Sequence, residues 1–323
     1  MRWFAPNAYG ALVVPALRSA GTVVAVEGHA RARVAVALGG GAAESAWRHS
    51  RQVGCPLIVY LWDLPPKGTG KGRYDPVWWL GGRFLRLPRP LGGYGRRRGY
   101  YSRLRYVAAR ADDVWVPSEF TRDTVERRFG VSATCVPYCY DSGRFTPGPP
   151  PPVAAGPERP VVLAVSRLQP HKNQAALIRA CARLQERVQL RLIGRGPEAG
   201  PLRRLALALG VDCRVETDVG DADVVRACRE SAVAVSASRF EGFGLGPIEA
   251  IACGLPAVAS DIPPHREFVC GAATLVPLDD DAALARAIGC ALRAPRPDPA
   301  AVGTLTVPAA AERIRSHLEP YLR

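Results

Sequence analysis

The second half of the chain alternates short apolar runs with longer segments in which apolar and charged positions recur at helical spacing. This alternation is typical of an open parallel α/β sheet. The predicted strands are residues 161–166, 188–193, 213–216, 233–236, 256–259 and 274–276. The predicted helices are residues 173–185, 202–209, 221–229, 247–252, 280–292 and 309–322. Because ligands of such sheets bind at the carboxyl ends of the strands, the site is expected in the loops that follow them.

The first half shows the same alternation less regularly. Its predicted strands are residues 1–4, 22–27, 57–62 and 113–117, and its predicted helices are residues 12–19, 100–110 and 119–129. Ser118 suits the N-cap of the helix over 119–129, and Gly130 suits its end. The alanine-rich stretch before Gly39 is predicted to be helical. Residues 67–99, rich in Gly and Pro, predict a long loop with short helices that covers or builds a site.

Prolines crowd residues 146–160, a density typical of a stiff extended linker. A length of 323 residues also favours two domains. We therefore expect an N-terminal domain over residues 1–147, a C-terminal domain over residues 148–305, and a final helical segment over residues 306–323.

Residues 236–260 are the stretch around which the rest of the chain is organised, because they predict a strand, a glycine loop, a helix and a strand in turn. The glycines of the loop are Gly242, Gly244 and Gly246. Pro247 suits the first helical position, where its missing N–H costs nothing. Free N–H groups and the helix dipole make such a helix start an anion site. Glu241 and Glu249, the latter expected in the first helical turn, frame the loop; the alternative is a helix cap with a solvated glutamate.

Arg167 and Lys172 lie five positions apart across a turn that follows a predicted strand. Two cations so placed can clamp a pyrophosphate. One cation 4 Å from a charge contributes ~4 kcal/mol at an effective dielectric constant of 20, before desolvation. That magnitude matters for a leaving group that gains charge in a transition state. The alternative is a surface turn with two solvated cations.

The motifs EGFGLGPIEAIACGLPAVASD (241–261) and SRLQPHKN (166–173) resemble the donor-site signatures of the retaining GT-B glycosyltransferases of family GT4, the mannosyltransferase-like glycosyl transferases group 1. The resemblance implies an α/β protein of two Rossmann-like domains that face each other across a cleft. In such enzymes the N-terminal domain binds the acceptor. The last helix of the chain crosses back and packs on the N-terminal domain. The implied reaction is retaining transfer of a hexose from a nucleotide-sugar to a hydroxyl, without an assigned nucleophile.

The same resemblance implies roles for single residues. The catalytic set would be Glu241 against the donor sugar, with Lys172 and Arg167 at the pyrophosphate. Glu249 would hold the ribose hydroxyls. The positions whose backbone would approach the donor are Gly10, Gly194, Gly196, Phe243, Gly244 and Leu245.

The acceptor side is the least defined part of the resemblance. Trp62 stands where related glycosyltransferases often carry a histidine before Asp-Leu, and this departure removes a polar group from the rim of the cleft. Asp63 is then the acceptor-side candidate, with the capping of its own loop as the alternative.

No metal or cofactor is expected, and the nucleotide-sugar is a substrate. Asp221 and Asp223 form a D-x-D pair, which binds a metal in the other glycosyltransferase fold, but here they begin a predicted helix and favour its positive end. His171 and His265 are interpreted as loop residues without ligand spacing. The nine cysteines show no paired framework, which fits a reducing cytoplasm.

The net charge of +14 is concentrated in residues 67–110, which hold twelve Lys and Arg, one acid and several Trp and Tyr. Such a field attracts anionic surfaces; an arginine-rich composition without function is the alternative. We expect a cytoplasmic protein without a membrane span, with peripheral contact to an anionic membrane, on the inner face of the plasma membrane, as an open possibility. Its expected partners are a nucleotide-sugar and a glycan, lipid-linked or small-molecule acceptor, and no specific nucleic acid. The alternative function is a catalytically silent sugar-nucleotide-binding or basic nucleic-acid-binding protein.

Overall fold

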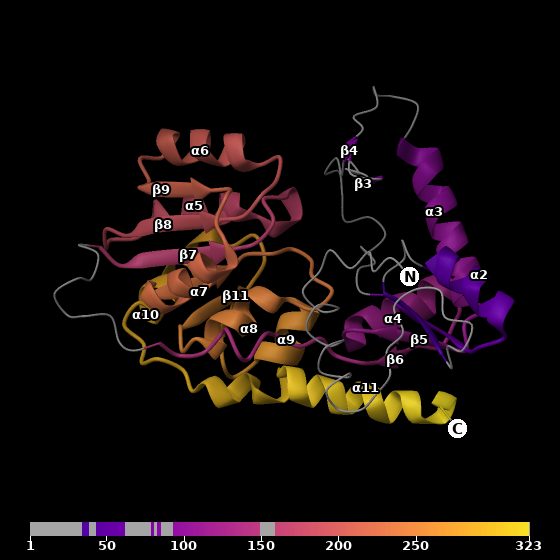
Figure 1. Ribbon diagram of the computed structural model, residues 1–323. Coiled ribbons are helices and arrows are strands. Elements are labelled where there is room, and N and C mark those ends of the chain that lie inside the picture. Colours follow the sequence, from indigo (N-terminus) through magenta and orange to yellow (C-terminus); the bar gives the residue numbers. More distant parts are fainter. Residues whose placement is uncertain are drawn as a thin grey trace.

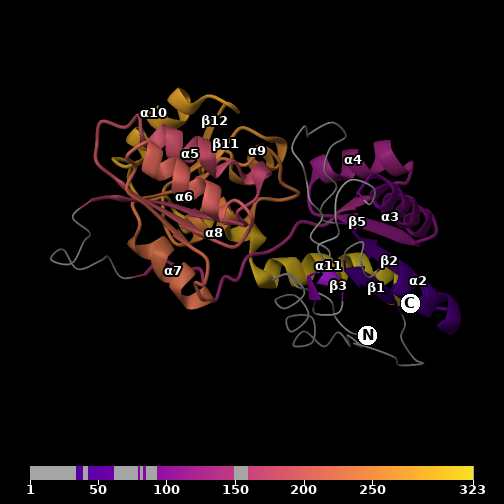
Figure 2. The ribbon, with the colours of Figure 1, turned by 90° about the horizontal axis from the view of Figure 1, so that it is seen from above.

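The computed structural model describes residues 34–38, 43–61, 79–80, 83–84, 93–148 and 159–322, of which 38, 79–80, 83–84 and 93–100 are described by their backbone alone. Within these residues the chain forms two parallel sheets, each with helices packed on it (Figures 1 and 2). This confirms the predicted α/β class. The predicted elements over 1–4, 12–19 and 22–27 lie outside the described residues.

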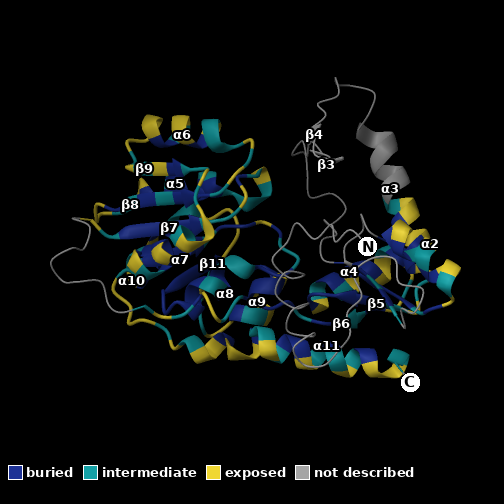
Figure 3. Cartoon of the chain, in the orientation of Figure 1, coloured by how far each residue is buried: buried dark blue, intermediate teal, exposed yellow. Residues whose placement is uncertain are grey.

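The C-terminal sheet has six parallel strands in the order β12-β11-β10-β7-β8-β9. The strands are β7 (Val161–Val165), β8 (Gln189–Ile193), β9 (Cys213–Glu216), β10 (Val233–Ser236), β11 (Ala257–Ser260) and β12 (Thr274–Val276). The helices are η1 (Pro170–Lys172), α5 (Gln174–Cys181), α6 (Ala199–Ala208), α7 (Asp221–Glu230), α8 (Leu245–Ala252), α9 (Pro263–Val269), α10 (Asp281–Ala291), η2 (Pro299–Leu305) and α11 (Val307–Leu322). The predicted strands of this half are all present. The central strands of this sheet are buried, as Figure 3 shows in dark blue. They consist of apolar runs because a parallel sheet is covered on both faces.

The N-terminal sheet has the order β1-β2-β5-β6, again parallel. Its strands are β1 (Ala35–Leu38), β2 (Leu57–Tyr60), β5 (Asp113–Val116) and β6 (Thr134–Cys135), and a separate hairpin pairs β3 (Trp79–Leu80) with β4 (Arg83–Phe84). The helices are α2 (Ala43–Val53), α3 (Gly93–Ala108) and α4 (Glu119–Phe129). Ser118 caps α4 by accepting a hydrogen bond from Thr121 N, and Gly130 ends the helix with φ 68°, both as predicted.

Three predictions about local structure are wrong. The alanine-rich stretch before Gly39 includes strand β1, because pairing with β2 and burial of Ala35 and Ala37 override the helix propensity of alanine. Helix α3 begins at Gly93, earlier than the predicted helical start at residue 100. His265 lies in helix α9, since the prolines before it occupy the first helical turn, where no N–H is needed.

The two sheets share an apolar cluster that also contains part of α11. Members of this cluster include Tyr60 and Trp115 from the N-terminal sheet and Ile314 from α11. The Trp115 ring lies 5.9 Å from the ring of His317, measured between centroids. Figure 1 shows α11 running beneath both sheets. The last helix therefore joins the two halves, while the exact domain boundaries stay a prediction.

Candidate functional site

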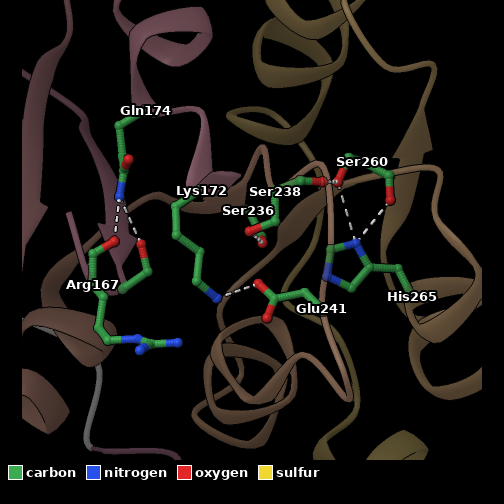
Figure 4. A network of polar contacts seen from close by, with 9 residues as sticks. Arg167, Lys172, Gln174, Ser236, Ser238, Glu241, Ser260 and His265 are labelled. Atoms are coloured by element: carbon green, nitrogen blue, oxygen red, sulfur yellow. Dashed lines mark hydrogen bonds and ion pairs between the residues drawn. The ribbon is translucent and has the colours of Figure 1, made fainter. Parts of the chain in front are cut away.

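The site lies where the strand order of the C-terminal sheet reverses. After β7 the chain adds β8 and β9 on one side and then returns to place β10 on the other side of β7. In open α/β sheets, ligands bind at such a reversal, beyond the carboxyl ends of the strands. Arg167 and Lys172 lie in the segment after β7, and Glu241 lies in the loop after β10. Figure 4 shows the ends of these three side chains turned toward a common space.

The turn after β7 is held in place by Gln174, a residue that the sequence reasoning missed. Its side chain is 3% exposed, and its Nε2 donates to Ser166 Oγ at 2.9 Å and to the Arg167 carbonyl at 3.0 Å. Asn173 closes the turn in the left-handed conformation, with φ 54°. The only sequence signal was a polar residue at the first position of a helix after the basic motif. Gln174 therefore fixes the backbone that carries Arg167 and Lys172.

Lys172 and Glu241 form a nearly buried ion pair. Lys172 Nζ donates to Glu241 Oε1 at 2.5 Å, and their side chains are only 12% and 14% exposed. Burial opposes ionisation of Glu241, but Lys172 outweighs it, with help from Ser238 and His265, and holds the pKa of this carboxyl below its usual value. The alternative of a solvated surface turn is therefore wrong for Lys172. The sequence placed both residues near the donor but did not predict that they pair.

The glycine loop places free backbone N–H groups beside this pair. Gly244 is the N-cap of α8 with φ 97°, and within the described part of the chain no side chain caps the helix. Phe243 is 3% exposed, and its ring lies 4.2 Å from that of Phe268 and 5.4 Å from that of Tyr138, between centroids. The Phe243 side chain thus belongs to the core, which leaves its backbone as the part of this residue that could contact a ligand.

Glu249 lies farther into the helix than predicted. Helix α8 begins at Leu245, not at Pro247, so the prediction that Glu249 lies in the first turn is wrong. Pro247 remains compatible with this start, since the first four helical N–H groups have no intrahelical partner. Glu249 lines a cavity between β7, β10 and α8, together with Val165, Ser236 and Gly246.

The surroundings of Glu249 favour its neutral form. Burial raises its pKa to about 8, Cys253 reinforces the rise, and Asp221 and Asp141 add to it more weakly, while Arg144 opposes it. Glu241 and Glu249 therefore differ in charge near pH 7: the first is ionised and paired, and the second is mostly protonated. Two carboxyl groups with opposite shifts in one site are typical of functional positions.

Gly194 and Gly196 are glycines because the backbone of the turn after β7 lies against them. A Cβ on Gly194 would lie 1.9 Å from the Ser166 carbonyl oxygen, and a Cβ on Gly196 would lie 2.0 Å from the Leu168 carbonyl oxygen. Loop packing alone therefore requires both glycines. Their predicted approach to the nucleotide stays a prediction.

The D-x-D pair lies in the first turn of α7, as predicted, and both acids meet arginines. Asp221 Oδ2 lies 3.2 Å from Arg144 Nη1, and Asp223 Oδ1 lies 2.7 Å from Arg226 Nη2. Among the described residues, no three His, Cys, Asp or Glu side chains form a group that could hold a metal. Gly10 and Asp63 lie outside the described residues, so their predicted roles stay predictions.

The N-terminal domain contacts the glycine loop through the start of α4. Ser118 Oγ donates to the Gly242 carbonyl oxygen at 2.7 Å. Glu119 N donates to both carboxylate oxygens of Glu267 on α9 at 3.1 Å. The cap of one helix in the N-terminal domain thus closes one side of the glycine loop.

Comparison with known proteins matches residues 151–302 to the family described as glycosyl transferases group 1. The chain is 34% identical over 217 residues to a GDP-mannose-dependent alpha-(1-6)-phosphatidylinositol monomannoside mannosyltransferase of Mycolicibacterium smegmatis, covering 60% of this chain and 56% of that protein. It is 33% identical over 177 residues to a D-inositol 3-phosphate glycosyltransferase of Saccharomonospora viridis, covering 48% and 41%. The chain thus spans about half the length of these curated relatives.

Solved structures share the fold of this chain. Anabaena HepE in complex with UDP superposes with a TM-score of 0.70 at 19% identity, covering 95% of this chain and 82% of that one. Sucrose-phosphate synthase from Thermosynechococcus elongatus gives a TM-score of 0.63 at 22% identity, covering 90% and 71%. At this identity the likeness shows the fold alone. Together with the matched family it confirms the resemblance: residues 151–302 are a domain of the glycosyl transferases group 1, in a chain that has the GT-B glycosyltransferase fold.

Proposed function

We propose that this protein is a retaining hexosyltransferase, which moves a hexose from a nucleotide-sugar to a hydroxyl of an acceptor. The observation that carries the proposal is the convergence of Arg167, Lys172 and Glu241 beside the uncapped start of α8, at the reversal of the strand order. Cations and free N–H groups suit a diphosphate, and a carboxylate suits the hydroxyls of a sugar.

The chemistry follows from charge. As the sugar–phosphate bond breaks, negative charge grows on the diphosphate, and preorganised positive groups stabilise that charge more in the transition state than in the ground state. Arg167, Lys172 and the N–H groups of α8 supply this stabilisation without a metal. The departing phosphate takes the proton of the acceptor hydroxyl, so no protein nucleophile is assigned.

GDP-mannose is the first donor to test, because relatives that match this chain are named GDP-mannose-dependent mannosyltransferases. UDP-glucose is the second, because HepE was solved in complex with it. The acceptors named for the relatives, a phosphatidylinositol mannoside and an inositol phosphate, favour a lipid-linked or phosphorylated polyol acceptor here.

The proposed function is tested by incubating the protein with GDP-mannose, UDP-glucose or dTDP-glucose and measuring release of the nucleoside diphosphate, with and without EDTA. We expect slow hydrolysis of one donor, insensitive to EDTA, and faster release when a mixture of lipid and polyol acceptors is added. The anomeric configuration of the product, read by NMR, should match that of the donor. No binding and no turnover of any donor, together with salt-dependent DNA binding, would contradict the proposal.

We also propose that the acceptor is presented at an anionic membrane. Among the helices that the structure describes, none is long and apolar enough to cross a bilayer. The attachment that we propose is peripheral and runs through the basic segment 67–110, part of which forms α3. Basic residues near an anionic surface contribute ~1 kcal/mol each, and Trp and Tyr favour the interface.

The protein is expected to sediment with anionic vesicles at low salt and to detach at high salt, because salt screens exposed charges. Replacing Arg96, Arg97 and Arg98 with Ser should weaken sedimentation. The matched control replaces three exposed arginines of the C-terminal domain with Ser and loses the same charge: Arg183, Arg187 and Arg204. Wild-type protein left in the supernatant at low salt would overturn the membrane proposal in favour of a small soluble acceptor.

A further inference from the structure

His265 has a buried polar side chain. Neither the family match nor the proposed reaction assigns a function to it. It lies on α9 and is 1% exposed. Its Nδ1 lies 2.8 Å from the Ser260 carbonyl oxygen, and a carbonyl can only accept, so Nδ1 carries the proton. Ser260 is held in turn, because its hydroxyl donates to the Ser238 carbonyl oxygen. The ring is therefore fixed as the tautomer in which Nε2 presents a lone pair.

His265 Nε2 has no hydrogen-bond partner among the described residues, although it is buried. A buried acceptor without a partner is uncommon in folded proteins and calls for an explanation. The edge of the ring is pressed against Gly244: a Cβ there would lie 3.0 Å from Nε2 and 3.9 Å from Glu241 Cγ. The imidazole and the stem of Glu241 thus flank one point of the glycine loop, and Figure 4 shows the second ring nitrogen turned toward Glu241.

The charged groups that influence His265 come from two other segments. Glu241, after β10, favours the protonated imidazole, while Lys172, at the end of η1, disfavours it. Burial is the largest effect and keeps the pKa of His265 below its usual value. On its own helix the charges are engaged elsewhere, since Arg266 pairs with Asp261 and Glu267 accepts hydrogen bonds from Glu119 N. Nearby, burial and Lys172 lower the pKa of His171 to about 4, so this second histidine is neutral.

A bound diphosphate would change this balance through Lys172. The ammonium group now bonded to Glu241 is one of the two cations placed for the phosphates, and a more highly charged anion competes for it with Glu241. When the ammonium moves toward the diphosphate, the group that disfavours a proton on His265 recedes. The carboxylate that favours this proton stays and loses its partner.

We propose that His265 becomes the partner of Glu241 when a nucleotide-sugar binds, and that donor binding takes up one proton from solvent at His265 Nε2. The proposal rests on the proposed function, because it requires a diphosphate beside Lys172. The imidazole becomes an imidazolium whose new N–H donates to the Glu241 carboxylate, and no covalent bond forms or breaks. His265 is a positioning residue: it holds the carboxylate ionised and in place against the donor sugar while Lys172 serves the leaving group.

The test is calorimetric titration of the full-length protein with GDP-mannose, and in parallel with UDP-glucose, at pH 7 in buffers of low and high ionisation enthalpy. The dependence of the observed enthalpy on the buffer gives the number of protons taken up. Neither donor has a phosphate that titrates near pH 7, so the donor adds no proton of its own. We expect the wild type to take up about one proton more than His265→Gln, which is polar but cannot titrate. Any proton released by Glu249 is common to both proteins and cancels.

A second readout does not depend on the variant's affinity. In protein with ¹⁵N-labelled histidine, the His265 signal, assigned by its loss in His265→Gln, should move from a neutral imidazole to an imidazolium when donor is added. Donor binding with equal proton uptake in both proteins and an unmoved signal would overturn the proposal and leave the proposed function intact. Absence of binding by either donor to the wild type would overturn both.

Discussion

Lys172→Ala is expected to lower kcat for donor turnover by ~10²–10³, the loss seen when one preorganised charge stabiliser is removed from an active site. The reason is that Lys172 Nζ is one of the two cations placed where the diphosphate gains charge. Initial rates with the donor that the screen selects, measured well below the melting temperature of the variant, give the comparison. An unchanged kcat/KM in a folded Lys172→Ala protein would contradict the assignment.

The same substitution should also destabilise the fold, because it leaves the Glu241 carboxyl without its cation in a nearly buried place. Removing one partner of such a pair costs roughly 3 kcal/mol. The double variant Lys172→Met with Glu241→Gln removes both charges, so it should recover most of the stability but none of the activity. Arg48→Ala is the control, since it breaks an exposed pair with Glu44 that is worth at most ~1 kcal/mol. A double variant as unstable as the single one would show that the ion pair is not the cause.

The elements of the C-terminal sheet could be predicted from the sequence because each depends on local pattern. A buried parallel strand is a short apolar run, and the turn after it concentrates glycine, proline and polar residues. Segment β1 escaped prediction because its alanines favour a helix in isolation, and only pairing with β2 makes it a strand. The start of α8 was placed two residues late because Pro247 suits the first helical position as well as the position that it occupies.

The composition of the site could be predicted, but its internal contacts could not. Lys172 and Glu241 are far apart in sequence and meet only because β7 and β10 are neighbours across the reversal of strand order. Gln174 and His265 carry no signature of their own. Their importance comes from burial and from the atoms that they face, which depend on tertiary structure.

Glu249→Gln is expected to abolish a loss of stability that the wild type shows as pH rises. Burial raises the pKa of Glu249 to about 8, above the ordinary value of 4.5, so between these values the folded protein binds more protons than the unfolded chain. Stability is then highest below the ordinary pKa and falls as pH rises through the window, until the loss is complete above about 8. At 1.36 kcal/mol per pKa unit, the loss is at most about 5 kcal/mol. Urea unfolding between pH 5 and pH 9 measures it.

The control for stability is Glu186→Gln, which changes an exposed carboxyl and should give the same pH dependence as the wild type. Glu249→Gln should instead become more stable relative to the wild type with each step toward pH 8. A constant difference between the two proteins over this range would show that Glu249 is ionised throughout, and would remove the contrast with Glu241 on which the assignment of separate roles depends.

The affinity for nucleotides should also depend on pH, because binding involves the proton of Glu249. If the ribose hydroxyls donate to an ionised Glu249, binding of GDP or UDP must release its proton, so affinity rises toward about pH 8 and by up to ~10-fold per pH unit. Glu249→Gln should lose both the affinity and this dependence, whereas Glu241→Gln should lower kcat and keep nucleoside diphosphate affinity nearly intact. The ionisation of the nucleotide itself is common to all three proteins, so the difference between them isolates the side chain. Equal losses of affinity in the two variants, measured by calorimetry, would mean that the sugar and ribose roles are misassigned.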